Sequence, residues 1–296
     1  MIRGKTNKET VSAILTADWH LMETKPVCRT DDFWIAQWRK VDFVSDLQKQ
    51  YDCPVIHSGD LYEYWKSSPS LLSETIKHLP KQFYTVLGNH DLPQHNLSLV
   101  EKSGVYTLEQ AGSLKILKGL HWGQKEFETP PTIEIDNRYI LVWHSMTYVG
   151  KPPYPGCLDP TASNLLKKFE KFQLDLILTG HNHQAFIAEL DGRLLINPGS
   201  LTRQTADQMD FEPRVYLYYA ESNTVKPIYL PIEEGVISRE HLDIVEKRND
   251  RIDAFINRLD GDWNITMSFE ENLKAFFQAN NVHESVKNLV YNAIEK

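Results

Sequence analysis

The sequence predicts an α/β protein in which two facing mixed β-sheets are flanked by helices, with a small helical extension at the C-terminal end. In the first part of the chain, strand-like apolar runs alternate with amphipathic helical segments, the pattern of a layered and mostly parallel sheet. In the second part, short apolar runs are separated by turn residues, which predicts a further series of strands. Beyond Pro231 only helical spacing remains. We therefore expect a main domain at 1–231 and an extension at 232–296.

The first part contains three predicted strands and two predicted helices. The longer helix has candidate N-cap residues at Thr30, Asp31 and Asp32, whose side-chain oxygens can accept a backbone hydrogen bond in the first turn. Its apolar residues recur at the spacing of one helical face. In order, the elements are a strand at 11–17, a helix ending near Gln50, a strand at 53–57, a helix at 70–79 and a strand at 83–87.

The second part is predicted to be rich in strands, and the chain ends in helices. Asp191-Gly192 lies between two strand-like runs and is a strong hairpin signal. Ser268 and Glu271 have the spacing of a capping box, which marks the start of a helix. The expected strands are 133–135, 139–143, 176–179, 186–190, 194–197, 215–219 and 225–230, with helices at 163–172, 241–259, 269–279 and 282–294.

Five short polar clusters lie where predicted strands end, and they carry the side chains that bind divalent metal ions. Carboxylate, amide and imidazole donors suit manganese, iron and zinc, and a paired site needs a carboxylate that bridges both ions. Because alternate residues of an extended strand point to the same side, Asp18 and His20 are expected to bind one ion together. The clusters are Asp18-Trp19-His20, Gly59-Asp60, Gly88-Asn89-His90-Asp91, His144 and Gly180-His181-Asn182-His183.

Each cluster taken alone has an ordinary structural explanation. A single Asp-x-His or His-x-His arises often by chance, and a histidine after an apolar strand is commonly a hydrogen-bonded structural residue. The joint occurrence of five clusters favours a dinuclear metal site, with glycines at 59, 88 and 180 that let the backbone approach closely. The three scattered cysteines lack any metal or catalytic spacing and are expected to be reduced thiols.

Three further residues are candidates for substrate binding. The segment 145–163 directly follows His144 and contains four prolines together with Tyr148 and Tyr154. A long proline-rich loop at this position is either a rigid connector or a wall of the substrate groove, and we favour the groove. Arg203 is the third candidate.

The composition argues against a membrane protein, and it argues only weakly against a nucleic-acid-binding protein. No apolar run approaches the roughly 20 residues of a membrane helix, and residues 1–8 lack the apolar core of a signal peptide, so we expect a cytoplasmic protein. The formal net charge of −8 disfavours a strong non-specific attraction to nucleic acid. Much of that charge lies at 232–296, however, and two divalent ions would bring the rest of the chain close to neutral.

The five clusters, in this order over residues 11–230, resemble the calcineurin-like metallophosphoesterase superfamily. The resemblance implies a four-layer metallophosphoesterase fold and hydrolysis of a phosphate ester by a hydroxide that two metal ions activate. It also implies that His90 stabilises the transition state or acts as general acid, and that Asp91 orients His90. One ion would be bound by Asp18, His20, Asp60 and His183, and the other by Asp60, Asn89, His144 and His181, with Asp60 bridging.

Finer motifs are similar to two branches of this superfamily. The stretches 15–21, 91–93 and 197–203 resemble the nuclease subunit of SbcCD-type DNA-repair complexes, which implies DNA as substrate and an ATPase partner docked on the C-terminal helices. Residues 59–65 also resemble the pyrophosphohydrolases of lipid A synthesis. We rank a DNA exo- or endonuclease first, a small-molecule phosphodiesterase or nucleotide pyrophosphohydrolase second, and a non-catalytic scaffold third. The expected cofactor is a pair of Mn²⁺ ions, with iron and zinc as alternatives, and a homodimer is a further expected assembly.

Overall fold

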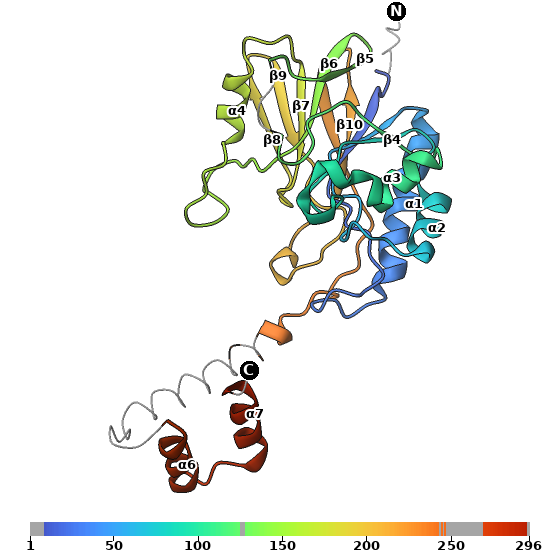
Figure 1. Ribbon diagram of the computed structural model, residues 1–296. Coiled ribbons are helices and arrows are strands. Elements are labelled where there is room, and N and C mark those ends of the chain that lie inside the picture. The colour runs from blue at the N-terminus through green and yellow to red at the C-terminus, as the bar shows by residue number, and fades with distance from the viewer. Residues whose placement is uncertain (1–8, 125–127, 243, 245, 247–268, 295–296) are drawn as a thin grey trace, which may run out of the picture. The chain divides into compact units, whose positions relative to one another are not determined.

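The computed structural model describes residues 9–124, 128–242, 244, 246 and 269–294 (Figure 1). The chain divides into two compact units, Met1–Ser238 and Arg239–Lys296. This division falls a few residues after the expected boundary between 231 and 232. The assignment of the first part as a catalytic domain and of the second as a partner-binding extension stays a prediction.

The first sheet combines a parallel core with an antiparallel edge. Among the described residues it consists of β1 (Ala13–Thr16), β2 (Val55–His57), β3 (Phe83–Thr85), β4 (Lys115–Ile116), β10 (Arg214–Tyr219) and β11 (Thr224–Tyr229). The spatial order is β11-β10-β1-β2-β3-β4. Strands β1 to β4 are parallel, whereas β10 pairs antiparallel with both β1 and β11. The carboxyl ends of β1, β2 and β3 therefore meet at one edge of the sheet.

The second sheet is also mixed. Its described strands are β5 (Thr132–Ile135), β6 (Arg138–His144), β7 (Leu176–Gly180), β8 (Phe186–Leu190) and β9 (Arg193–Asn197). They lie in the order β5-β6-β7-β9-β8, with β6, β7 and β9 parallel. The predicted hairpin between β8 and β9 is confirmed, and both of its turn residues, Asp191 and Gly192, have positive φ angles of 52° and 74°.

Four α-helices belong to the described part of the first unit. They are α1 (Phe33–Tyr51), α2 (Pro69–His78), α3 (Gly104–Gln110) and α4 (Ala162–Lys168), with 3₁₀ turns at Pro93–His95, Leu97–Lys102 and Ala206–Gln208. Of the three candidate N-caps of α1, Asp32 is the one whose side chain accepts from Ile35 N. Strand β4 and helix α3 were not predicted, because each is short, and α3 buries only two large apolar side chains, Val105 and Leu108.

The helices and sheets of the first unit form four layers (Figure 1), and the alternation of side chains along the strands fills the space between these layers. In β1, Ile14 packs in the core beneath α1, whereas Ala13 and Leu15 pack in the core between the two sheets. In β6, Ile140 belongs to that same central core and Leu141 packs with α4 on the opposite face. The first unit thus stacks helices, sheet, sheet and helix, and the expected four-layer fold is confirmed.

The second unit contains two described helices, α6 (Phe269–Ala279) and α7 (Glu284–Ile294), as predicted for this part of the chain. Leu273, Phe276 and Phe277 of α6 form a small apolar core with residues of α7. The helix predicted at 241–259 lies mostly outside the described residues, which are helical at 240–242, 244 and 246. No helix in the described part of the chain is both long and apolar enough to cross a membrane.

Candidate metal centre

The seven predicted metal ligands gather where parallel strands of both sheets end. This edge is where α/β proteins commonly place their sites, because successive loops converge there. The connecting segments therefore bring together residues that lie far apart in the sequence. Asp18 follows β1, Asp60 follows β2, Asn89 follows β3, His144 ends β6, and His181 and His183 follow β7.

One group of donors surrounds the imidazole of His20. His20 Nε2 lies 3.1 Å from His183 Nε2 and 3.9 Å from Asp18 Oδ1. It also lies 3.7 Å from Asp60 Oδ2. Asp18, His20 and His183 each direct one ligand atom into a space no more than 4.8 Å across, which fits the coordination of one cation. All of these residues except His183 are almost completely buried.

A second group of donors surrounds Asn89. His144 Nε2 lies 3.1 Å from Asn89 Oδ1, and His181 Nδ1 lies 2.9 Å from the same oxygen. His144 Nε2 is also 3.2 Å from Asp60 Oδ2. The same Asp60 oxygen thus faces both groups of donors. This is the position that a bridging carboxylate needs, and the bridging role of Asp60 that the resemblance implies stays a prediction.

The hydrogen-bonding pattern fits metal ions at these two positions. His144 Nδ1 lies 2.7 Å from the carbonyl oxygen of Ser58, so this nitrogen carries the proton and donates it. Without an ion, Nε2 must also carry a proton to bind the oxygens of Asp60 and Asn89 that it faces, whereas in a neutral ring its lone pair is available to a cation. A cation among these atoms satisfies all three acceptors, and the oxygen and imidazole donor set suits a transition metal or similar divalent ion.

The buried charges of the centre compensate one another. Although burial opposes the ionised form of Asp60, neighbouring His144 and His20 hold the pKa of its carboxyl well below its usual value. Burial also opposes a charged His144, but the Asp60 carboxylate raises its pKa to about 9. Burial lowers the pKa of His181 to about 4 and that of His183 to about 3. These last two imidazoles are therefore neutral, which is the form that binds metal.

The geometry of the loop tips differs from the sequence expectation in one respect. Asp18 and His20 were expected to share a face because they lie two apart on an extended strand, but β1 ends at Thr16. Their φ angles are 49° and 47°, and Asp60 and His181 also have positive φ angles, of 58° and 77°. The left-handed backbone therefore brings these side chains together, and strain of this kind is concentrated at functional sites.

At two of the three glycines in the motifs, the backbone lies so close to a candidate ligand that a side chain would not fit. A Cβ atom added at Gly88 would lie 2.0 Å from Asp60 Oδ1, and one added at Gly59 would lie 2.5 Å from His144 Nδ1. Gly59 also has a φ of 99°, which L side chains rarely adopt. The backbone therefore packs directly against two candidate ligands, as the glycines in the motifs suggested.

The predicted role of Asp91 is wrong. Its buried carboxylate accepts hydrogen bonds from the backbone N–H groups of Asp60 at 2.8 Å, Gly88 at 3.0 Å and Tyr62 at 3.3 Å. His90 is oriented instead by Glu63, whose carbonyl oxygen lies 2.7 Å from His90 Nδ1. Asp91 thus ties two loops of the centre together through their backbones, because both of its oxygens are used by main-chain donors.

Two residues of the centre were missed in the sequence. Glu63 Oε2 lies 2.8 Å from His20 Nδ1, so Glu63 fixes the ring of one candidate ligand while its carbonyl holds His90. The ring of Trp122 lies 4.5 Å from that of His181 and covers it at a tilt of 38°. Glu63 follows Gly59-Asp60 closely and could have been suspected, whereas Trp122 lies outside every metal-binding motif.

The three candidate substrate-binding residues are placed differently. Tyr148 is half-buried and pairs through its backbone with Thr161. Tyr154 is 46% exposed and its hydroxyl donates to Asp159 at 2.7 Å within the same loop. Arg203 is buried and its guanidinium donates to two main-chain carbonyls, as described below. A substrate-binding role for each of the three stays a prediction.

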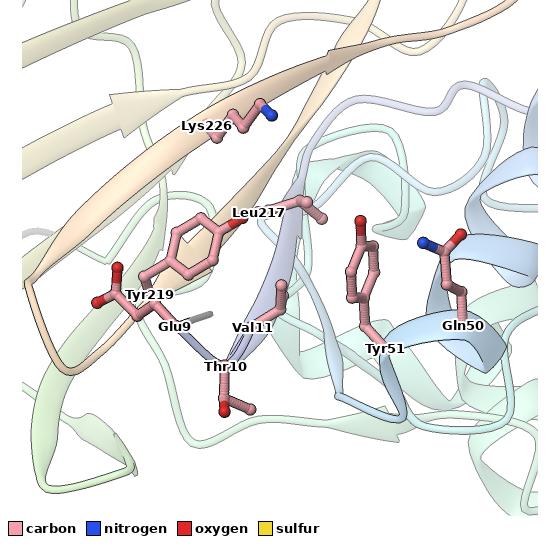
Figure 2. A pocket seen from close by; sticks show the side chains of 8 residues that line it. All are labelled: Glu9, Thr10, Val11, Gln50, Tyr51, Leu217, Tyr219 and Lys226. Carbon is pink, nitrogen blue, oxygen red and sulfur yellow. The ribbon is translucent and has the colours of Figure 1, made fainter. Parts of the chain in front are cut away.

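A wide cavity of about 660 Å³ lies elsewhere in the first unit (Figure 2). It adjoins the segment that precedes β1, at the opposite end of that strand from Asp18. Figure 2 shows Tyr51 and Tyr219 on either side of Val11 in its wall. None of the seven metal-ligand candidates lines this cavity.

A family model described as the calcineurin-like phosphoesterase superfamily domain matches residues 14–217. The chain belongs to the calcineurin-like phosphoesterase superfamily. No curated protein matches it. Similar solved structures include an archaeal phosphodiesterase, 16% identical, which covers 74% of this chain and 99% of its own at a TM-score of 0.44. A Vps29 single mutant from Entamoeba histolytica is also 16% identical and covers 75% and 99% of the two chains at a TM-score of 0.37.

Membership of the calcineurin-like phosphoesterase superfamily agrees with the donor geometry. Proteins of this superfamily bind divalent metals, and all seven candidate ligands lie within the matched residues. Three groups among the described residues could hold a metal ion, and two of them consist of these candidates alone. The groups are Asp18-His20-His183, Asp60-His144-His181 and His20-Glu63-His90. The chain is therefore a member of the calcineurin-like phosphoesterase superfamily whose described residues include clusters that could hold divalent metal ions.

Proposed function

We propose that this protein is a two-metal phosphodiesterase, with DNA as the substrate class. The observation that supports the proposal best is Asp60 Oδ2, which lies 3.7 Å from His20 Nε2 and 3.2 Å from His144 Nε2. A single carboxylate oxygen between two complete donor groups is typical of a dinuclear centre. When bound, two divalent ions would lower the pKa of water and offset the charge that develops on the phosphoryl oxygens.

His90 is the residue best placed to assist the leaving group. Its side chain is 35% exposed, whereas those of His20 and Asp60 are each 1% exposed, so His90 borders the opening of the centre. Its backbone N–H donates to Asp60 Oδ1 at 2.8 Å, and its Nδ1 donates to the Glu63 carbonyl. These two bonds fix the ring and leave Nε2 to donate a proton to the leaving oxygen.

DNA as substrate, manganese as metal and an ATPase partner are finer parts of the proposal. They derive from the resemblance of residues 15–21, 91–93 and 197–203 to the nuclease subunit of SbcCD-type complexes. Helices α6 and α7 would then supply the surface on which the partner docks. Phe276 and Phe277 hold these two helices together through their own apolar core.

Hydrolysis of bis(4-nitrophenyl) phosphate with Mn²⁺ tests the activity. The wild type should release nitrophenol, Asp60→Ala should reduce the rate to background, and His90→Asn should lower kcat by about 10²–10⁴-fold while the metal content is retained. Asp46→Ala is the control, because Asp46 is an exposed carboxylate of α1 whose partner is Lys49. A wild-type protein that is inert with manganese, iron and zinc would contradict the proposal and favour a scaffold.

Small diesters are the second candidate substrate class. The net charge of −8 and the likeness of residues 59–65 to the pyrophosphohydrolases favour them. Single-stranded DNA, double-stranded DNA and nucleotide diesters offered side by side distinguish the two classes. Rapid turnover of the small diesters with intact DNA would replace the nuclease with a small-molecule phosphodiesterase.

A further inference from the structure

Cationic side chains line a small cavity beside the first turns of α1, outside the metal centre. Arg29, Arg39, Lys40 and Arg203 contribute four positive charges to its wall, and Asp31 and Glu233 contribute two negative charges. We call it the basic cavity. Its volume is about 10 Å³, close to the space that one water molecule or one small ion occupies.

Both carboxylates of the basic cavity are already paired. Asp31 accepts from Arg29, with Nε at 2.8 Å from Oδ1 and a second, shorter contact through Nη2. Glu233 Oε1 lies 2.9 Å from Arg39 Nη1, and both side chains of this pair are exposed. The remaining charges, those of Lys40 and Arg203, have no carboxylate of their own in the cavity wall.

These two cations are deeply buried and incompletely partnered. Lys40 is 3% exposed, and its Nζ has no hydrogen-bond or ion-pair partner among the described residues. Arg203 is 5% exposed and donates through Nη1 to Met209 O at 2.9 Å and through Nη2 to Glu233 O at 2.6 Å. Its Nε atom is buried and without a partner. A fully buried donor without a partner, such as Arg203 Nε, is rare in native structures and is usually satisfied by a water molecule or an ion.

The charge of the surroundings favours an ion over a water molecule. Burial and the nearby charges of Arg29 and Arg203 lower the pKa of Lys40 to about 8, so its ammonium is still the main form at neutral pH. A water molecule satisfies hydrogen bonds but leaves two uncompensated positive charges in a buried place, which is costly. An anion satisfies the same donors and also neutralises charge.

We propose that the basic cavity binds a small inorganic anion, either a halide such as chloride or one oxygen of an oxyanion such as phosphate. Lys40 Nζ and Arg203 Nε would donate to it, and the exposed Arg39–Glu233 pair would mark its entry path. The bound anion would also support the metal centre, because Arg29 donates to the carbonyl of Arg203, and the next residue, Gln204, donates to the carbonyl of His20 at 3.0 Å.

Thermal unfolding of the full chain in excess EDTA tests this proposal without interference from metal-bound anions. Chloride, bromide, phosphate or sulfate is titrated against gluconate, a bulky anion that keeps the ionic strength constant. The wild type should show a saturable rise in Tm of roughly 3–8 °C with at least one small anion. Lys40→Met should abolish that rise. The control Lys49→Met removes an exposed lysine of the same helix and should respond like the wild type.

The pattern among the anions identifies the source. A response to halides alone assigns a monoatomic ion, and a response to phosphate and sulfate alone assigns an oxyanion. Equal responses of the wild type and Lys40→Met, or none beyond gluconate, would overturn the proposal. Should Lys40→Met fail to fold, wild-type crystals soaked in bromide give an independent result. An anomalous peak beside Lys40 and Arg203 supports the site. The absence of a peak at high bromide concentration, together with no rise in the wild-type Tm with phosphate or sulfate beyond gluconate, overturns the proposal.

Discussion

Gly88→Ala should disable the metal centre although it removes no metal ligand. The added Cβ would lie 2.0 Å from Asp60 Oδ1 and 2.5 Å from both the Cγ and the backbone nitrogen of Asp60. Ordinary van der Waals contact begins at 3.4 Å, so the Oδ1 atom must move by about 1.4 Å. The backbone N–H of Asp60 is held by Asp91, and the strain therefore falls on the carboxylate between the two donor groups.

This displacement sets the expected size of the effect. A misplacement of about 1 Å in a reacting site lowers the rate by about 10²-fold, and overpacking a buried position costs about 1–3 kcal/mol of stability. We expect kcat/KM for bis(4-nitrophenyl) phosphate with Mn²⁺ to fall about 100-fold. Affinity for Mn²⁺, measured by calorimetry, should fall by roughly 10–100-fold.

Gly192→Ala is the matched control for stability. Gly192 lies in the β8–β9 hairpin with a φ of 74°, and an added Cβ there meets nothing within 4 Å. The control should lose about 1–2 kcal/mol through backbone strain alone and keep its activity. Wild-type activity in folded Gly88→Ala protein would refute the reasoning. An equal loss of activity in both variants would show that lowered stability, and not a displaced Asp60, is the cause.

Three further changes test other contacts. Glu63→Gln should weaken Mn²⁺ binding by roughly 10–100-fold, because Glu63 orients His20, whereas Glu74→Gln on α2 should leave calorimetric affinity unchanged. Trp122→Ala should weaken Mn²⁺ binding only about 2–10-fold, because it removes one aromatic contact with His181. Burial lowers the pKa of His121 to about 4, below that of an unfolded histidine, so the unfolded chain takes up the proton first. Stability should therefore fall by about 3 kcal/mol as pH drops from 6.5 to 4. Urea unfolding should show that the free energy of unfolding of His121→Asn depends less steeply on pH than that of the wild type. The same pH dependence in both proteins would contradict this prediction.

Apolar periodicity and strand-end motifs predicted most of the fold and the residues that gather at the candidate metal centre, because both depend on local sequence. Leu15 and Ile140 could be assigned to strands from their neighbours alone. The left-handed backbone conformation of Asp18 and His20 could not be predicted, because the apolar pattern of a strand gives no information about the loop that follows it. The hydrogen-bond partner of His90 could not be predicted from the sequence either. Asp91 is adjacent to His90 in sequence, but its carboxylate accepts from a backbone amide of a different loop, that of Asp60.

The role of Arg203 was equally hidden. Arg203 was a candidate for substrate binding, yet its guanidinium donates to the carbonyls of Met209 and Glu233. A main-chain carbonyl has no side-chain signature, so neither Met209 nor Glu233 can be recognised in the sequence as a partner of Arg203. Residues whose partners are main-chain atoms of remote segments are therefore the ones that pattern reading assigns least well.

The donor side chains are divided between the two sheets. Asp18, Asp60 and Asn89 follow strands of the first sheet, whereas His144 and His181 stand at strand ends of the second. Neither sheet supplies all of the candidate ligands. A bound cation would therefore link the two sheets and resist movement of one sheet relative to the other. Removal of the metal ions by a chelator should then lower the stability of the two packed sheets. Fragments that each contain one sheet should bind two metal ions only after they associate.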